Sequence, residues 1–430
     1  MDKLINASLV IDWGFSRFKS WLYDSNGQLI KYDYLYTCDF CLNNTIYYDD
    51  DLAKLLKYIF NFLDNLDCVV NLSLYSSSQM HCAGVVSSSY GSVLSTWNDL
   101  PSFYTSKSIT SSINGIPFLP SMPLHKFNLK TPRPSSYLFN KINSKCDQGL
   151  IDYFASPVGL LFTEVFKSKL PCTLSWWQST CLPSDILSIS GDRGSYLSEQ
   201  PLYLSPQTLN SFHPKVNSIL YFPEIGDLQA STYASCSKHD IIINLGTGSQ
   251  VIVSNPELCP SYSYFRFWPL NNIKYPVISH VPCGRLLQRF IEFNNLSFSD
   301  LSDALFSLTS QKVLQIADST PQSLLFFPGY CFFADKYIDS NFNSIEQICS
   351  LDVDVLLSLW VYQYRQIIKS LLRHNFNSGG SLSIVVTGSL GGLSVLFINL
   401  LQQIMPSPFV VSYEKTELPQ SLMSIFAENN

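Results

Sequence analysis

The first part of the chain alternates short apolar runs with polar turns, as a small sheet requires. Residues 8–14 form an apolar run that contains Asp12 near its end and closes on a glycine, and this pattern predicts a buried strand. Residues 15–24 and 28–34 predict two more strands, because the Asn26-Gly27 pair between them favours a tight hairpin turn. We therefore expect three antiparallel strands at the start of the fold.

A helix and another strand follow this three-stranded unit. Residues 49–66 carry apolar side chains at intervals of three and four, so they predict an amphipathic helix that packs on a sheet. Residues 68–74 then predict a buried strand. A strand, a helix and a strand in this order are typical of the α/β class.

The second half of the chain also mixes strand and helix patterns. Residues 241–245 form an apolar run of strand length, and we expect a second short strand after the turn at residues 246–249. Residues 383–403 predict a strand, a glycine-rich turn and a helix, an order found at nucleotide-binding edges. Further elements are expected as a strand at 262–268 and as helices from 284, over 301–316 and over 353–376.

Length and composition narrow the class of protein. The 430 residues predict two or three domains. The net charge of −6 disfavours a surface that holds nucleic acid or an anionic membrane through bulk charge. No apolar run reaches the ~18 residues that span a bilayer, and the first residues lack the layout of a signal peptide. Because the 12 cysteines are scattered along the chain, we expect reduced thiols and a cytoplasmic protein.

A glycine-led segment supplies the first candidate for chemistry. Gly226 allows a sharp entry into a helix, and Asp227 is then a favoured residue at the helix start. The positive end of the helix stabilises a carboxylate there in the ionised form that a proton acceptor needs. Residues 246–249 offer backbone N–H groups and hydroxyls to phosphate oxygens. A base and a phosphate-binding turn together indicate phosphoryl transfer to a hydroxyl.

The strand that contains Asp12 has two interpretations. Three antiparallel strands with an aspartate at the first tight turn can form a mononucleotide site of the actin type, in which the aspartate orients a hydrated Mg²⁺. The other interpretation is an ordinary meander in which Asp12 caps a turn. This stretch alone favours the meander.

Polar and aromatic residues gather after the strand expected at residues 68–74. The first group is Ser78-Gln-Met-His-Cys-Ala-Gly84, and Thr96-Trp-Asn-Asp99 follows it. Amide, imidazole and carboxylate groups pair with hydroxyls while a ring covers a C–H face, so the combination is typical of a polyol-binding cleft. The alternatives are a core role for His81 and plain packing for Trp97.

These motifs, in this order and spacing, resemble those of the FGGY carbohydrate kinases, and among them most of all the sedoheptulose kinases. Residues 226–236 (Gly-Asp-Leu-Gln-Ala-Ser-Thr-Tyr-Ala-Ser-Cys) resemble the family's segment around its catalytic aspartate. Residues 78–81 and 96–99 resemble its two sugar-site motifs. The remaining matches are its two phosphate motifs and its adenosine loop, at residues 11–19, 244–250 and 387–392.

The resemblance implies an α/β fold with two actin-like, ribonuclease H-like ATPase domains and a cleft between them. Residues 1–220 would form the sugar-binding domain and residues 221–430 the ATP-binding domain. The implied reaction is the phosphorylation of a ketose by ATP and Mg²⁺ at a primary hydroxyl, with sedoheptulose as the first candidate and ribulose, xylulose or a sugar acid as alternatives. The implied partners are this sugar and ATP, without nucleic acid or membrane, for a monomer or homodimer.

The resemblance also implies a role for each matching residue. Asp227 would take the proton from the sugar hydroxyl, and Asp12 would position Mg²⁺. The residues implied at the phosphates and adenosine are Gly14, Ser16, Gly246, Thr247, Gly248, Ser249, Gly388, Ser389 and Gly391. Those implied at the sugar are Gln79, Met80, His81, Trp97, Asn98, Asp99 and Gln229.

The sequence departs from the family pattern beside Asp12. Phe15 and Arg17 stand where the family carries small hydroxyl residues. Because these side chains are large enough to crowd the phosphates, a second hypothesis is a protein of the same fold that binds a sugar or nucleotide without catalysing a reaction.

Overall fold

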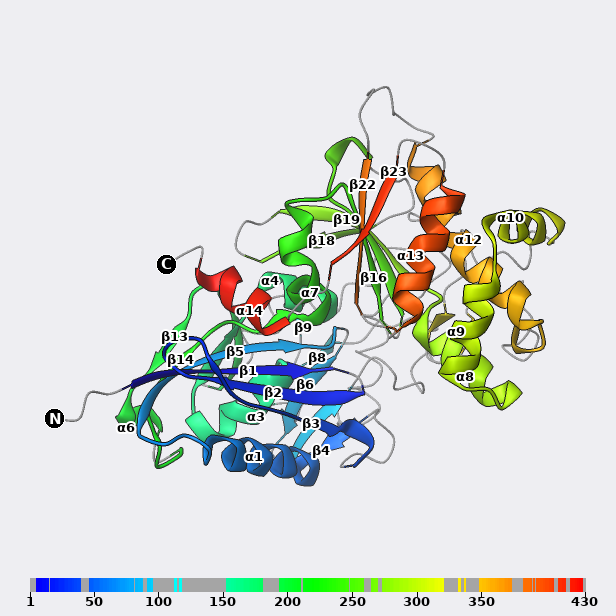
Figure 1. Ribbon diagram of the computed structural model, residues 1–430. Helices are drawn as coiled ribbons and strands as arrows, with labels where there is room; N and C mark the ends of the chain where they lie inside the picture. Colours follow the sequence, from blue (N-terminus) through cyan, green and yellow to red (C-terminus); the bar gives the residue numbers. More distant parts are fainter. Residues whose placement is uncertain are drawn as a thin grey trace.

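The fold consists of two lobes, each built on its own sheet (Figure 1). The first lobe lies at the lower left of the figure and the second at the upper right. The computed structural model describes residues 5–14, 16–39, 46–80, 82–87, 91–95, 112–113, 116–117, 152–180, 193–209, 212–246, 248–258, 264–269, 273–320, 332–333, 336–337, 348–372, 382–388, 390, 392–405, 409–414 and 418–427.

The sheet of the first lobe contains the three-stranded unit that the sequence predicts. Its strands, in order across the sheet, are β13 (Leu202–Leu204), β14 (Val216–Tyr221), β5 (Val70–Ser78), β1 (Ile5–Trp13), β2 (Arg17–Tyr23) and β3 (Leu29–Tyr36), with β15 (Ile225–Gly226) paired to the end of β5. The pairs β1–β2 and β2–β3 are antiparallel, which confirms the three expected antiparallel strands. On the other side of β1, the strands β5, β14 and β15 run parallel to β1 and to one another.

Helices cover both faces of this first sheet. Leu9, Ile11 and Trp13 of β1 point into a core shared with α1 (Asp49–Leu63) and α3 (Pro157–Phe166). Val10 points to the opposite face, where it packs with α14 (Leu418–Ala427). The alternation of the strand therefore supplies two cores, as it must in a sheet that is buried on both sides.

Smaller elements complete the first lobe. α4 (Leu174–Thr180) packs near the end of β15, and α6 (Pro206–Leu209) lies beside β13 and β14. A smaller sheet in this lobe has the order β10 (Tyr153–Ala155), β6 (Ala83–Ser87), β7 (Gly91–Ser95) and β4 (Ile46–Tyr48). The short pairs are β11 (Lys169–Cys172) with β12 (Gly194–Leu197) and β8 (Ser112–Ile113) with β9 (Ile116–Pro117), and the 3-10 turn η1 covers Thr37–Asp39.

The sheet of the second lobe has three neighbouring parallel strands on one side and antiparallel strands on the other. Its order is β18 (Tyr264–Phe267), β19 (Lys274–Val281), β17 (Ser249–Val253), β16 (Ile241–Leu245), β22 (Leu382–Gly388) and β23 (Phe409–Tyr413). Ile241 and Ile243 belong to the main core of this lobe, whereas Ile242 packs on the other face with Leu228 of α7 (Asp227–Cys236). The apolar run predicted as a strand is thus buried on both faces, as central parallel strands are.

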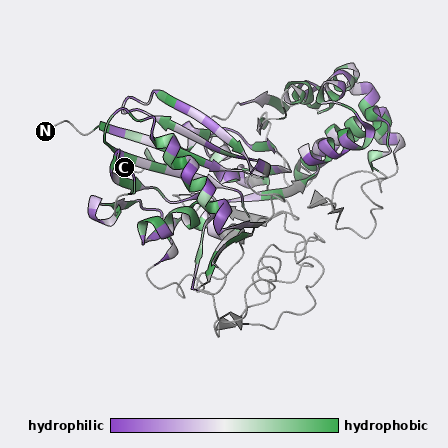
Figure 2. Cartoon of the chain, turned by 90° about the horizontal axis from the view of Figure 1, so that it is seen from below, coloured by the Kyte–Doolittle hydropathy of each residue, from purple (hydrophilic) through white to green (hydrophobic). Residues whose placement is uncertain are grey.

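Five helices pack on the main-core face of this sheet in the described part of the second lobe. They are α8 (Gly284–Asn294), α9 (Phe298–Ser307), α10 (Ser310–Ser319), α12 (Val353–Leu372) and α13 (Leu393–Ile404), with η4 at Pro256–Leu258 and the hairpin β20 (Phe332–Phe333) and β21 (Lys336–Tyr337) elsewhere in the lobe. Figure 2 shows the alternation of hydrophilic and hydrophobic residues that makes these helices amphipathic.

The single helix expected over residues 301–316 is wrong, because the structure has two helices there. Leu308 has an extended backbone with ψ 134°, which ends α9. The Thr309 side chain then accepts a hydrogen bond from the backbone N of Lys312 at 3.2 Å and caps α10. The apolar spacing continues through the break, so only the capping threonine distinguishes two helices from one.

Helices α4, α7 and α14 join the lobes. α4 contacts β15 of the first lobe and β18 of the second. α7 begins at the end of β15 in the first sheet and packs on β16 and β22 of the second. α14 follows the last strand of the second lobe but lies on the first sheet and against α7 (Figure 1). No helix in the described residues combines the length and the apolar character that a membrane span needs.

Candidate active site

The candidate residues of the first lobe come together where three parallel strands end. Ser77 of β5 lies opposite Asp12 of β1 on one side and opposite Ile225 of β15 on the other. The register therefore brings Asp12, Gln79 and Asp227 to the same edge of the sheet. The carboxyl ends of parallel strands are where α/β folds bind their ligands.

Asp12 is buried and paired on both carboxylate oxygens. The Lys19 ammonium lies 2.8 Å from Oδ2, and the Ser77 hydroxyl donates to Oδ1 at 2.8 Å. The negative charge of Asp12 raises the pKa of Lys19 above its ordinary value, against the opposing effect of burial. Asp12 therefore lies in a fixed ion pair beside the turn that joins β1 to β2.

The turn between β1 and β2 carries the other residues expected at a phosphate. The Gly14 backbone N donates to the Arg17 carbonyl at 3.0 Å, and Ser16 is exposed. The Arg17 guanidinium lies over the ring of Tyr34 at 4.7 Å and over that of Tyr36 at 5.1 Å. The Arg17 side chain therefore packs on two tyrosines of β3. Phe15 lies outside the described residues.

Asp227 is the first residue of α7, and Gly226 is the N-cap. The backbone N of Leu228 donates to the Asp227 Oδ1 at 2.8 Å, and the carboxylate is only partly buried. The helix dipole and the free N–H groups of the first turn favour a negative charge at this position. The expectation of a carboxylate at a helix start is confirmed, with the capping position one residue earlier than expected.

Close packing joins the Asp227 segment to the end of β5. A Cβ atom added to Gly226 would lie 2.4 Å from Oε1 of Gln229 and 3.1 Å from Cγ of Met80, so a larger residue would have to displace these two side chains. Met80 is buried in an apolar cluster with Leu228 of α7 and Ile242 of the second sheet. The Met80 side chain therefore packs between the lobes and holds the two segments together.

Gln79 has a buried side chain that lacks internal hydrogen bonds. Only 2% of the residue is exposed, and neither Nε2 nor Oε1 has a hydrogen-bond partner within the described part of the chain. Its backbone is fixed, because its N–H donates to the Trp13 carbonyl at 2.9 Å. Buried amides normally find partners, so the Gln79 amide is a candidate for hydrogen bonds to a ligand.

In the second lobe, the two predicted nucleotide turns lie side by side. Leu245 at the end of β16 is opposite Gly388 at the end of the parallel strand β22. Gly388 has φ +88°, and a Cβ atom there would lie 2.0 Å from the Leu245 carbonyl oxygen. Glycine is therefore required at this position both by the backbone conformation and by the neighbouring strand.

The N-terminus of α8 adjoins the turn that contains Gly246. The backbone N of Gly284, the first residue of α8, donates to the Gly246 carbonyl at 3.1 Å. A Cβ atom at Gly248 would meet nothing within 4 Å, so this part of the turn is open. Ser249, by contrast, is fully buried near Tyr364 of α12, and its hydroxyl faces the interior.

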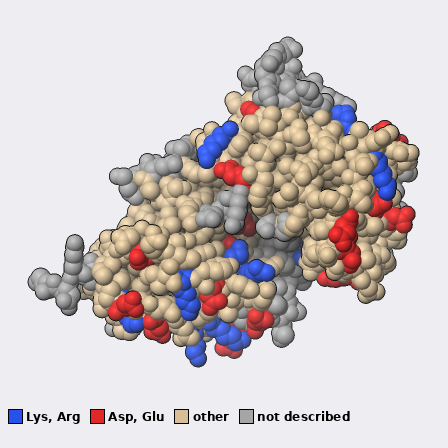
Figure 3. Space-filling view, in the orientation of Figure 1, with Lys and Arg blue, Asp and Glu red and all other residues tan. Residues whose placement is uncertain are grey.

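The described residues of these turns are glycines and uncharged residues, so they offer an anion backbone dipoles. Over the molecule as a whole, most of the face in Figure 3 carries neither acidic nor basic side chains. Backbone N–H groups of glycine turns and a helix N-terminus suffice for phosphate binding in such surroundings. The expected residues His81, Trp97, Asn98, Asp99, Thr247, Ser389 and Gly391 lie outside the described residues.

No protein-family model and no curated protein matches this chain. Solved structures do resemble it. A xylulose kinase from Lactobacillus acidophilus has a TM-score of 0.60 at 15% identity, over 98% of this chain and 88% of its own. A gluconate kinase from the same organism has a TM-score of 0.57 at 14% identity, with coverage of 98% and 88%. Plasmodium falciparum glycerol kinase with ADP has a TM-score of 0.58 at 13% identity, with coverage of 98% and 89%. The chain therefore has the two-domain actin-like ATPase fold of sugar kinases, as the sequence resemblance implies.

Proposed function

We propose that this protein is a carbohydrate kinase that transfers the terminal phosphate of ATP to a primary hydroxyl of a ketose, with sedoheptulose as the first candidate. Sedoheptulose is proposed from the sequence motifs alone. The similar structures are a xylulose, a gluconate and a glycerol kinase, so xylulose, ribulose and a sugar acid are the alternatives to test.

One observation carries the proposal. The partly exposed carboxylate of Asp227 and the unpaired, buried amide of Gln79 follow neighbouring strands at the same edge of the first sheet. A carboxylate accepts a proton from a hydroxyl, and an amide both donates to and accepts from hydroxyls. The pair thus offers a base and a polyol-binding group to one substrate.

The remaining residues are assigned by their place around this pair. In the proposal Asp227 is the base, and Gln79 and Gln229 bind the sugar with His81, Trp97, Asn98 and Asp99. Met80 positions the sugar-binding segment through its packing between the lobes. The phosphates and adenosine bind at Gly14, Ser16, Gly246, Thr247, Gly248, Gly388, Ser389 and Gly391, and Ser249 contributes its backbone.

The described residues fit a nucleotide with its metal ion. The open turn at Gly248 and the N-terminus of α8 would together bind phosphate oxygens. Because both oxygens of Asp12 already accept hydrogen bonds, Asp12 would hold Mg²⁺ through the ion's water molecules. When bound, Mg²⁺ would neutralise charge on the phosphates.

The test is release of ADP from ATP-Mg²⁺ in the presence of sedoheptulose, xylulose, ribulose, gluconate or glycerol. Asp227→Asn should fold and bind ATP as the wild type does, while kcat falls by ~10² or more, because the base is lost and the shape is kept. Asp303→Asn, on the exposed side of α9, is the matched control and should have wild-type activity. Equal activity of the wild type and Asp227→Asn with every acceptor would refute the proposal.

A second candidate is a binding protein without kinase activity. It is favoured by the pairing of Asp12, whose two oxygens are both engaged inside the protein. Calorimetry separates the candidates: the kinase binds both a sugar and ATP-Mg²⁺, whereas a sugar-binding protein gives heat with the sugar only.

A further inference from the structure

Glu224 is a fully buried carboxylate three residues before Asp227. Its side chain crosses from the catalytic segment to the N-terminus of α3. The backbone N of Val158 donates to Oε1 at 3.3 Å, and that of Gly159 donates to Oε2 at 3.0 Å. The Ser78 hydroxyl also donates to Oε1. One carboxylate therefore binds a helix start and the end of β5 together.

The backbone of Glu224 is fixed as firmly as its side chain. Its N–H donates to the Pro171 carbonyl at 3.2 Å. Its carbonyl accepts from the Thr173 N at 2.9 Å and from the Thr173 hydroxyl at 3.0 Å. Glu224 thus has little freedom to move, and neither does the short segment that leads from it to Asp227.

Burial raises the pKa of Glu224, while hydrogen bonds from Ser156, Ser78 and the first turn of α3 act in the opposite direction. The two backbone N–H groups can only donate, so both carboxylate oxygens must accept. The positive end of α3 adds a favourable interaction with a negative charge. The surroundings are therefore built for a carboxylate, and an amide would point its NH₂ group at an N–H donor.

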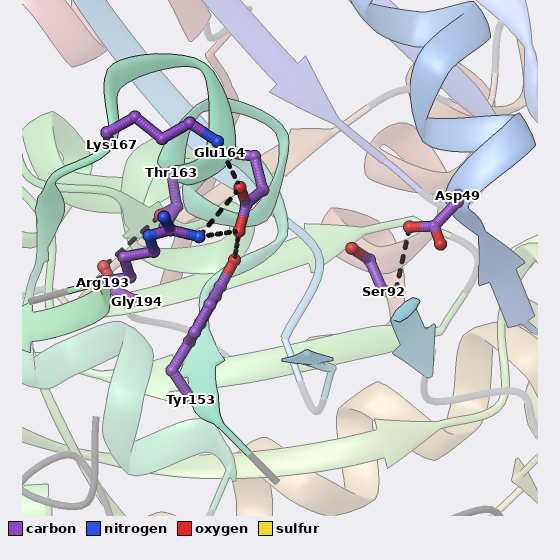
Figure 4. Close-up of polar contacts among 8 residues, drawn as sticks. All are labelled: Asp49, Ser92, Tyr153, Thr163, Glu164, Lys167, Arg193 and Gly194. Atoms are coloured by element: carbon purple, nitrogen blue, oxygen red, sulfur yellow. Dashed lines mark hydrogen bonds and ion pairs between the residues drawn. The ribbon is translucent and has the colours of Figure 1, made fainter. Parts of the chain in front are cut away.

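The helix that receives Glu224 is also anchored at its other end. Near its C-terminal end, Glu164 binds Lys167 at 2.7 Å and Arg193 at 3.3 Å, and it accepts from the Tyr153 hydroxyl (Figure 4). The Thr163 hydroxyl donates to the Gly194 carbonyl at 3.4 Å. These contacts hold the C-terminal end of α3 to β10 and β12, away from the first turn that binds the Glu224 carboxylate.

Two residues of the proposed site, Gln79 and Asp227, lie next to the residues that Glu224 helps to hold. Ser78 immediately precedes Gln79, and Ser78 is paired in the sheet with Gly226, which immediately precedes Asp227. Glu224 cannot be a base itself, since it is buried and both its oxygens accept hydrogen bonds. We propose that Glu224 is a positioning residue that holds the Gln79 amide and the Asp227 carboxylate at a fixed spacing. This inference rests on the proposed kinase function.

The test compares Glu224→Gln with Glu164→Gln, the same change at the exposed end of the same helix. In Glu224→Gln, kcat should fall about 10–100-fold while the KM for ATP stays within about twofold, because misplacement of reacting groups by ~1 Å costs up to about 10² in rate. Glu164→Gln should keep both constants. Glu224→Asp keeps the charge but shortens the reach, so its kcat should lie between those of the wild type and Glu224→Gln.

Hydrogen exchange provides a readout that needs no turnover. Exchange at residues 77–80 and 225–229 should accelerate in Glu224→Gln and stay unchanged in Glu164→Gln, with the second sheet unaffected in both. If kcat of folded Glu224→Gln equals that of the wild type, or if exchange accelerates over the whole protein, the positioning role is overturned. If the wild type phosphorylates no sugar, the kinase proposal fails, and the exchange at these two segments alone decides the role of Glu224.

Discussion

Replacing Gln79 by methionine should stabilise the protein in the absence of sugar while it weakens sugar binding. Gln79 has two buried polar atoms without partners in the described part of the chain. Methionine has a similar length and no polar atom that needs a hydrogen bond, so it can fill the same space. The substitution therefore removes the destabilising effect of two unpaired polar atoms, which are kept in the proposed function because they bind the sugar.

The magnitude follows from the two unpaired atoms. Each unsatisfied buried group costs ~1–3 kcal/mol, so at the lower end the two cost about 2 kcal/mol. For a lobe of this size, 1 kcal/mol shifts Tm by roughly 2–4 °C, which predicts a rise of about 4–8 °C for Gln79→Met. The loss of two hydrogen bonds to sugar hydroxyls, ~1 kcal/mol each, should lower kcat/KM roughly 30-fold.

Thermal melting with and without sugar measures both effects without relying on turnover. A sugar at 100 times its Kd should stabilise the wild type by about 2.7 kcal/mol and Gln79→Met by much less. The control is Gln363→Met in α12, where the buried amide Nε2 donates to the Pro282 carbonyl at 2.8 Å, although Oε1 has no partner in the described part of the chain. That variant loses a hydrogen bond and leaves the Pro282 carbonyl without this donor, so its Tm should not rise as that of Gln79→Met does. If the sugar-free Gln79→Met protein melts below the wild type, the reasoning is refuted, because the wild-type Gln79 amide would then have hydrogen-bond partners without a ligand.

Two further changes test the ion pair and the nucleotide turn. Lys19→Met leaves the buried Asp12 carboxylate with its Ser77 hydrogen bond but without its counter-charge, and should destabilise the protein by about 3 kcal/mol at neutral pH. Asp12 raises the pKa of Lys19 above 10.5, so the extra stability of the wild type over Lys19→Met is fully present below this pH and is lost as pH rises through the pKa of Lys19 in the folded protein. Urea unfolding at several pH values would measure this loss. Gly388→Ala should lower Tm more than Gly27→Ala. Both glycines have positive φ, but only at Gly388 would a Cβ atom meet a carbonyl oxygen. Equal losses in Tm would contradict the steric argument. ATP affinity, measured by calorimetry, should fall only in Gly388→Ala.

Local patterns were sufficient for most of the elements that position the site. The alternation in residues 8–34 and the Asn26-Gly27 turn predict β1, β2 and β3, and their pairing is confirmed. The apolar run of β16 and the glycine turns after β16 and β22 also lie where the sequence places them. These features depend on near neighbours in the chain, so the sequence carries them directly.

Features that depend on distant contacts were missed. Glu224 stands in an apolar stretch, which is an unusual place for a charge, but its partner helix α3 begins 67 residues earlier, at Pro157. The sequence alone does not show that these segments meet. Met80 is similar: its neighbour His81 suggests a sugar contact, whereas the structure packs the Met80 side chain with residues of the second lobe.

The return of α14 to the first lobe constrains how the molecule can move. The chain crosses between the lobes once between β15 and β16 and again between β23 and α14, and the Ser421 hydroxyl binds the Ala230 carbonyl of α7 at 2.6 Å. With two chain crossings, we expect the second lobe to rotate about the axis through them rather than to turn freely as it would on a single tether. Asp227 lies beside this axis, at the start of α7. Such a rotation would bring the glycine turns of the second lobe towards Asp227, the proposed base, while Asp227 itself moves little.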